Sequence, residues 1–130
     1  GSDPRVGAVV ALDPNDNTGR DGAENAHRVS APVAVLRGEV SLGNGLSQGI
    51  VDHLPAGKQH YKILGAHHFD FMSTSSRGYK NEENRSAMRY ATAFLLSKLL
   101  GRTDMDAYTG NGARIRAAAQ RGELEVWAAE

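Results

Sequence analysis

Three short apolar runs, separated by longer polar stretches, occupy the first half of this 130-residue chain. They read "VGAVVAL" at 6–12, "PVAVLRG" at 32–38 and "HYKILGA" at 60–66. The first is a continuous apolar run, rich in valine and bounded by turn formers, which is typical of a strand that is covered on both faces. Pro32 begins the second run, which is a position in a strand where proline is tolerated. The pattern therefore predicts three buried strands.

The polar stretches predict how these strands are connected. Residues 15–31 are polar and contain glycine, which favours a long loop with room for one helical turn. Residues 46–54 predict a short helix that Pro55 and Gly57 stop. About twenty residues separate each strand from the next, enough for a parallel crossover. We therefore expect an α/β fold with a three-layer, doubly wound, mostly parallel sheet.

From residue 82 onward the apolar period becomes helical. Asn81 is a suitable cap for this helix and Gly101 a suitable stop. The stripe expected to face the core consists of Ala87, Met88, Ala91, Phe94, Leu95 and Leu99. A second helix is expected over 112–121, and Val126 and Trp127 in the final "ELEVWAAE" are expected to dock against the rest. We expect residues 1–101 to form one unit and 102–130 a C-terminal helical extension.

A parallel sheet of only three strands would be incomplete. Both of its faces need cover, and the strand at 6–12 would leave a bare edge, which invites pairing with another chain. The pattern thus indicates part of a larger sheet.

Composition narrows the function classes. The chain has 15 basic and 15 acidic residues, so its net charge is zero, and it has no cysteine. Binding of nucleic acid through bulk charge, thiol catalysis and thiolate metal sites are therefore not expected. No apolar run approaches the roughly 18 residues of a membrane span. We expect no cofactor, and the compartment stays open.

Polar residues follow all three predicted strands, where open α/β sheets collect their functional groups. Asp13 follows the first strand, Glu39 the second, and His67 and His68 the third. An acid that orients a histidine, and a histidine that takes a proton from serine, are two of the three members of an acyl-transfer triad. The order acid before histidine is the one found in α/β-type serine hydrolases.

Simpler interpretations exist for each residue. An aspartate before proline is commonly a turn former, and a histidine in a loop is commonly solvated. A zinc site at His67, His68 and Asp70 is an alternative. His68 and Asp70 would share a face there, and a third ligand would have to come from His53, His60 or elsewhere. Otherwise His27, His53 and His60 are expected at the surface. "TGNGA" at 109–113 precedes a helix but lacks the lysine of a phosphate-binding loop, so its glycines are expected to form only a turn.

"VGAVVALDPNDN", "APVAVLRGE", "GAHHFDFM" and "SAMRYATAFLLSKLLG", in this order, resemble the C-terminal half of an α/β-hydrolase. The likeness is greatest to the chlorophyllase and dienelactone-hydrolase-like esterases, with the polyester-degrading lipases as cousins, and covers about residues 3–101. It implies an Asp-Pro-x-Asp turn at 13–16 and a His-x-Asp turn at 68–70.

The resemblance assigns roles to these turns. His68 would be the general base and acid, and it is preferred to His67 because such families usually have a small residue at that position. Asp13 would orient His68. Many members carry the acid after the next strand instead, where this chain has "GEVS" with Ser41 at the expected position. Glu39 is therefore an alternative acid, and Asp16 a third choice.

The chain departs from the family in lacking a nucleophile elbow. No Gly-x-Ser-x-Gly occurs; Ser47 does not follow a strand directly, and the serines of "MSTSSRG" fit a loop. The resemblance then implies that an N-terminal half, either a separate chain or a segment outside these residues, supplies the serine and the oxyanion amides. The complete protein would cleave a small carboxylic ester through an acyl-enzyme. The alternative is a non-catalytic fragment or interaction module that pairs through its open sheet edge, as an oligomer or with another subunit.

Overall fold

The computed structural model describes residues 3–14, 21–40, 46–54, 57–72 and 81–129. Its strands are β1 (Val9–Leu12), β2 (Val33–Val40), β3 (Lys58–His67) and β4 (Leu124–Ala129). Its α-helices are α1 (Asp21–Ala26), α2 (Leu46–His53), α3 (Glu82–Leu100) and α4 (Ala113–Gln120), and η1 (His68–Phe71) and η2 (Thr103–Tyr108) are 3₁₀ helices.

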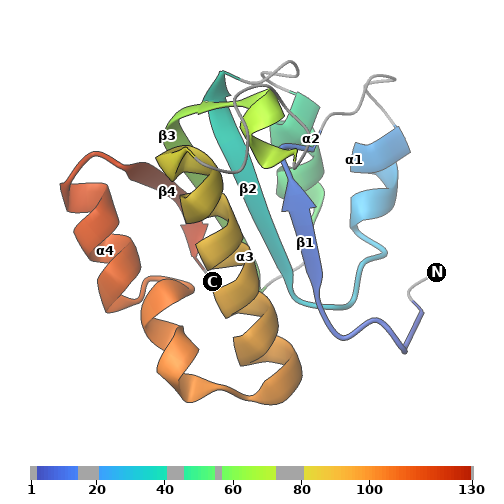
Figure 1. Ribbon diagram of the computed structural model, residues 1–130. Coiled ribbons are helices and arrows are strands. Elements are labelled where there is room, and N and C mark those ends of the chain that lie inside the picture. Colours follow the sequence, from blue (N-terminus) through green and yellow to red (C-terminus); the bar gives the residue numbers. More distant parts are fainter. Residues whose placement is uncertain (1–2, 15–20, 41–45, 55–56, 73–80, 130) are drawn as a thin grey trace.

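The described strands form one sheet in the order β1-β2-β3-β4 (Figure 1). β1, β2 and β3 are parallel, with Val9 opposite Val33 and Val33 opposite Lys58. The α/β class and the mostly parallel sheet predicted from the sequence are thereby confirmed. β4 was not predicted, and it runs antiparallel to β3.

The segment expected to be a helical extension is therefore part of the main sheet. Besides η2 and α4 it contains β4, which pairs with β3 from Gln59 to Ile63. Ile115, Ala118 and Leu124 share one buried cluster with Leu36 and Tyr61. Residues 102–129 thus pack on the same core as the strands that precede them.

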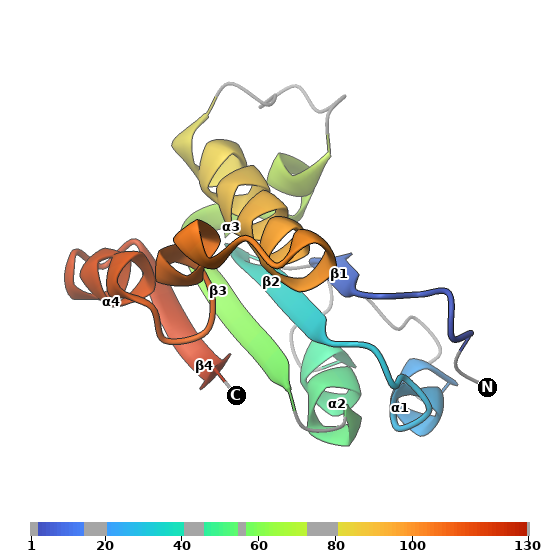
Figure 2. The ribbon, with the colours of Figure 1, turned by 90° about the horizontal axis from the view of Figure 1, so that it is seen from below.

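Helices cover both faces of the sheet, as the two views show (Figures 1 and 2). α3 and α4 lie on one face, over a core that includes Leu36, Tyr61 and Ile63. α1 and α2 lie on the other, beneath β1 and β2, where Val33 and Val35 pack against Val51 and Leu54. None of the helices in the described ranges has the length and apolar character that a membrane crossing requires.

Helix α3 begins and ends where the sequence predicted. The Asn81 side chain accepts a hydrogen bond from the backbone N–H of Asn84 at 2.8 Å, and Gly101 ends the helix in a left-handed conformation with φ of 63°. Its buried stripe is displaced from the expected one towards Asn84 and Ala93, which are also buried. Ala87, Ala91 and Phe94 are buried at i, i+4 and i+7 spacing, together with Tyr90.

Met88 and Leu99 were wrongly assigned to this stripe, because Met88 is 38% exposed and Leu99 is 53% exposed. Met88 lies one residue, or about 100° of rotation, away from the stripe that begins at Ala87.

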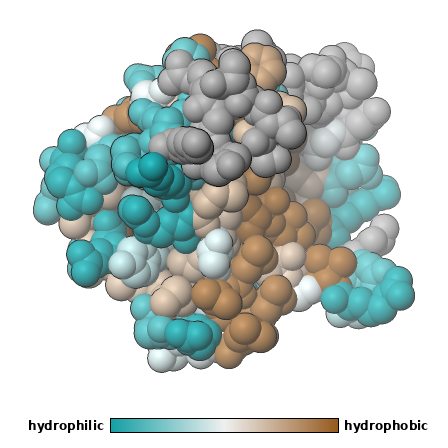
Figure 3. Space-filling model, in the orientation of Figure 1, coloured by the Kyte–Doolittle hydropathy of each residue, from teal (hydrophilic) through white to brown (hydrophobic). Residues whose placement is uncertain are grey.

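Several of the exposed apolar side chains gather beside β1. Val6, Leu12, Met88, Leu99 and Leu100 are all exposed, and an ideal Cβ on Gly7 would lie 2.7 Å from Leu99 Cδ2. Figure 3 shows a continuous apolar area on this side of the molecule. Among the described strands, β1 pairs with β2 alone. Within the described part of the chain, its outer edge therefore has no strand partner and is flanked by apolar surface.

Candidate active site

The ends of β1 and β3 bring Asp13 and His68 into contact across the end of β2. His68 opens η1 directly after β3, and its Nδ1 lies 2.5 Å from Oδ2 of Asp13. The Asp13 side chain is fully buried, whereas 27% of the His68 side chain is exposed. Because a carboxylate oxygen only accepts, Nδ1 carries the proton in this contact. Nε2 is left as the ring nitrogen that can take a proton from another group.

The backbone of Asp13 is held in an uncommon conformation. Its φ is 42°, the single positive φ at a non-glycine residue in the described part of the chain. Such a conformation costs about 1–2 kcal/mol for most residues and least for asparagine and aspartate. Two hydrogen bonds offset this cost, from Asp13 N–H to the Leu36 carbonyl at 2.6 Å and from Gly38 N–H to Asp13 Oδ1 at 3.0 Å. They turn Oδ2 towards His68.

Gly38 anchors Asp13 only because it lacks a side chain. An ideal Cβ on Gly38 would lie 2.8 Å from the carbonyl oxygen of Ala66, close to the end of β3 that carries His68. The neighbour is backbone, so it cannot rotate away. The two strands approach closely here, and that approach lets one carboxylate reach both β2 and η1.

Replacing Gly38 with alanine is expected to lower the free energy of unfolding by about 1–3 kcal/mol, as overpacking does elsewhere. Urea unfolding followed by circular dichroism measures this. Adding Ala66→Gly should not restore stability, because the clash is with the Ala66 backbone oxygen rather than with its methyl group. A Gly38→Ala variant as stable as the wild type would contradict the close approach.

The other sequence-predicted acids occupy different places. Glu39 accepts a hydrogen bond from the backbone N–H of Gly65 at 2.7 Å, so it braces β3 instead of contacting the His68 ring. Asp16 and Ser41 lie outside the described residues, as do the serines after Met72. Ser47 lies in α2.

The predicted alternative of a metal site is not assembled. Asp70 is buried and accepts hydrogen bonds from His67 N–H and Asn81 Nδ2, and His68 faces Asp13. Within the described ranges, no three histidine, aspartate or glutamate side chains come together in a group that could hold a metal ion.

The glycines of residues 109–113 make a turn, as expected. Gly110 has a φ of 55°, and a Cβ on Gly112 would lie 2.2 Å from the Asp106 carbonyl oxygen.

His60 is a further residue whose burial was predicted wrongly from the sequence. It was expected at the surface, but it is fully buried, and neither ring nitrogen has a hydrogen-bond partner among the described residues. Its ring meets Trp127 edge-on at 5.1 Å, and the Arg37 guanidinium lies 4.7 Å from the same indole. Burial, and secondarily the nearby Arg37 charge, lower the pKa of His60 to about 4. His27 and His53 are exposed, as predicted.

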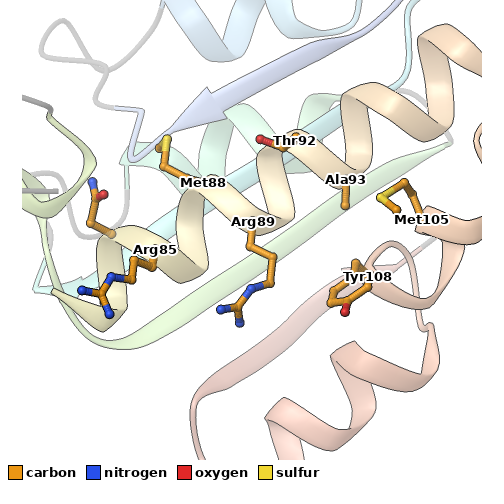
Figure 4. A pocket seen from close by; sticks show the side chains of 8 residues that line it. Arg85, Met88, Arg89, Thr92, Ala93, Met105 and Tyr108 are labelled. Carbon is orange, nitrogen blue, oxygen red and sulfur yellow. The ribbon is translucent and has the colours of Figure 1, made fainter. Parts of the chain in front are cut away.

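A large groove lies away from the acid–histidine pair. It has a volume of about 650 Å³ and runs along α3 opposite Met105 and Tyr108 (Figure 4). Arg85 and Arg89 project along its side, and neither Asp13 nor His68 lines it.

Comparison with known proteins identifies no relative from which a function could be assigned. No protein-family model matches the chain, and no curated protein sequence is significantly similar to it.

Proposed function

We propose that this chain supplies the acid and the histidine of a serine-type carboxylic ester hydrolase, in which Asp13 orients His68. The contact between Asp13 Oδ2 and His68 Nδ1 carries the proposal. Its support lies in the combination of a fully buried acid, a partly exposed histidine and a backbone donor that fixes the second carboxylate oxygen. A surface ion pair would not need these restraints.

The proposed chemistry assigns one task to each ring nitrogen. Nδ1–H of His68 stays bonded to Asp13, which fixes the tautomer and stabilises the imidazolium. Nε2 takes the proton of a serine hydroxyl while the serine oxygen forms a bond to the carbonyl carbon of the ester. The same proton then passes to the alcohol as the ester C–O bond breaks. Water repeats the sequence on the acyl-enzyme and releases the acid.

The serine and the oxyanion donors belong to an N-terminal half in this proposal. The open edge of β1 is the place for that half to join, because a further parallel strand there would end beside Asp13. Apolar side chains on the approach to β1 and on α3, such as Val6 and Leu99, are exposed at this edge. A strand added with its own helix would bury them.

The same edge supports the alternative function. An unpaired strand flanked by apolar residues can pair with a second copy of this chain or with another subunit without any chemistry. In that case the Asp13–His68 pair would have no nucleophile to serve.

Native mass spectrometry of the protein, with and without a fluorophosphonate serine probe, separates the two functions. A heterodimer whose other chain takes the probe supports the hydrolase. His68→Ala should then abolish ester cleavage and leave the heterodimer intact, because the β1 edge lies outside the substitution. An unlabelled monomer would reject the hydrolase and leave a non-catalytic fragment, whereas an unlabelled homo-oligomer would favour the interaction module.

A further inference from the structure

Asp70 is a buried carboxylate that lies two residues after His68, in η1. Among the described residues its side chain accepts two hydrogen bonds, one from a residue that precedes it and one from a residue that follows it. Oδ2 accepts from the backbone N–H of His67 at 2.8 Å, and Oδ1 accepts from Asn81 Nδ2 at 2.7 Å. One carboxylate thus ties the residue before His68 to the residue that caps α3.

A third hydrogen bond completes this connection. Asn84 Nδ2 donates to the backbone carbonyl of Asp70 at 2.5 Å, and Asn84 is itself buried in the first turn of α3. Asn81 has two roles, because its Oδ1 caps Asn84 N–H while its Nδ2 holds Asp70. We call Asp70, Asn81 and Asn84 the η1 clamp.

The His68 ring depends on this backbone for its position. It contacts Asp13 on one side and meets the edge of Phe69 at 5.5 Å. Because His68 is the first residue of η1, the course of η1 decides whether Nδ1 reaches Oδ2 of Asp13. Hydrogen bonds to a buried carboxylate are stronger than neutral ones and directional, which suits them to fix such a turn.

We propose that the η1 clamp positions His68 for proton transfer, with Asp70 and Asn81 acting through the backbone of residues 67 and 68. This inference rests on the proposed role of His68. It assigns a function to a carboxylate that touches neither Asp13 nor the His68 ring in any described contact.

The decisive variant is Asn81→Ser. Serine retains an oxygen that can cap α3, but it lacks the amide that holds Asp70 Oδ1. Nitrogen-15 NMR of the labelled full chain reports the His68 tautomer and the exchange of its Nδ1 proton with water. We expect proton exchange at least tenfold faster than in the wild type and a larger share of the Nε2–H tautomer, with an unchanged circular dichroism spectrum.

Glu82→Gln is the matched control. Glu82 follows Asn81 and is the first residue of α3. Its side chain is exposed and pairs with Arg85 rather than with η1. Its substitution should leave the His68 signals as they are. Asp70→Asn should resemble Asn81→Ser, because an amide in this position can no longer accept from both neighbours through carboxylate oxygens.

Folded Asn81→Ser with wild-type His68 signals would overturn the inference and reduce the η1 clamp to a structural role. If Asp70→Asn does not fold, Asn81→Ser and Asn81→Asp decide, since aspartate caps the helix but repels Asp70. Loss of the His68 signals in Asn81→Ser without any probe-labelled serine partner would support the clamp and reject the proposed hydrolase. The two proposals therefore fail separately.

Discussion

Asp13→Asn is expected to lower the turnover of the proposed hydrolase, once assembled, by roughly 10⁴-fold, as removal of the triad acid's charge does in serine proteases. Asparagine fits the site because it tolerates the φ of 42° and keeps Oδ1 for the Gly38 N–H. At Oδ2, however, it places an amide that donates and cannot accept from His68 Nδ1–H. The imidazole must then adopt the other tautomer, with its proton on Nε2, where the serine hydroxyl needs an acceptor.

The chain alone provides an independent readout. Nitrogen-15 NMR of Asp13→Asn should show His68 with its proton on Nε2 instead of Nδ1, and urea unfolding should show a native-like transition. Glu39→Gln is the control, because glutamine can still accept from Gly65 N–H. Its turnover should remain within a few-fold of the wild type. A larger loss in Glu39→Gln than in Asp13→Asn would mean that Glu39 is the acid.

Acid should destabilise this protein through His60 as the pH falls below about 6.5. The pKa of His60 is about 4 in the folded chain and about 6.5 when the chain is unfolded. Above pH 6.5 the ring is neutral in both states and has no effect. Between pH 6.5 and 4 the unfolded chain binds a proton that the folded chain does not, so the free energy of unfolding falls with pH. The full loss is up to about 3 kcal/mol.

His60→Leu should remove this dependence. Leucine needs no hydrogen-bond partner, so the variant should be at least as stable at pH 7 and progressively more stable than the wild type towards pH 4.5. Urea unfolding at several pH values measures the difference. His27→Gln, at an exposed histidine, is the matched control and should follow the wild type. If the free energies of unfolding of the wild type and His60→Leu change with pH in the same way, the pKa of His60 is the same in the folded and the unfolded chain.

The sequence predicted the parts of the fold that local chemistry determines. The short apolar runs identified β1, β2 and β3, and the Asn81 cap and Gly101 stop located α3 to the residue. Placing Asp13 and His68 near each other followed from their position after parallel strands. Their direct contact was expected only through the resemblance; the local pattern could not predict it, because it depends on the close approach of Gly38 to Ala66.

The errors arose where pairing across the sheet overrides local pattern. "ELEVWAAE" alternates weakly, with charges and small residues, and only the neighbouring β3 makes it a strand. Because β4 was not predicted, no residue was expected to pack over His60, and His60 was assigned to the surface. In the structure the Trp127 ring meets it from β4. Period-two alternation within "HYKILGA" could have indicated that His60 and Tyr61 face opposite sides of a covered strand.

The pairing of β4 with β3 also bears on the order of folding. Ile63 pairs with Leu124, so this ladder closes a loop of roughly sixty residues that contains α3 and α4. Contacts between residues so far apart form slowly, whereas α3 can form locally. We therefore expect the amides of β4 to be the last in the sheet to gain protection during refolding. Until then His60 is exposed to water and keeps the ordinary pKa of a histidine. Its pKa falls, and the protein becomes sensitive to acid through it, only when β4 docks on β3.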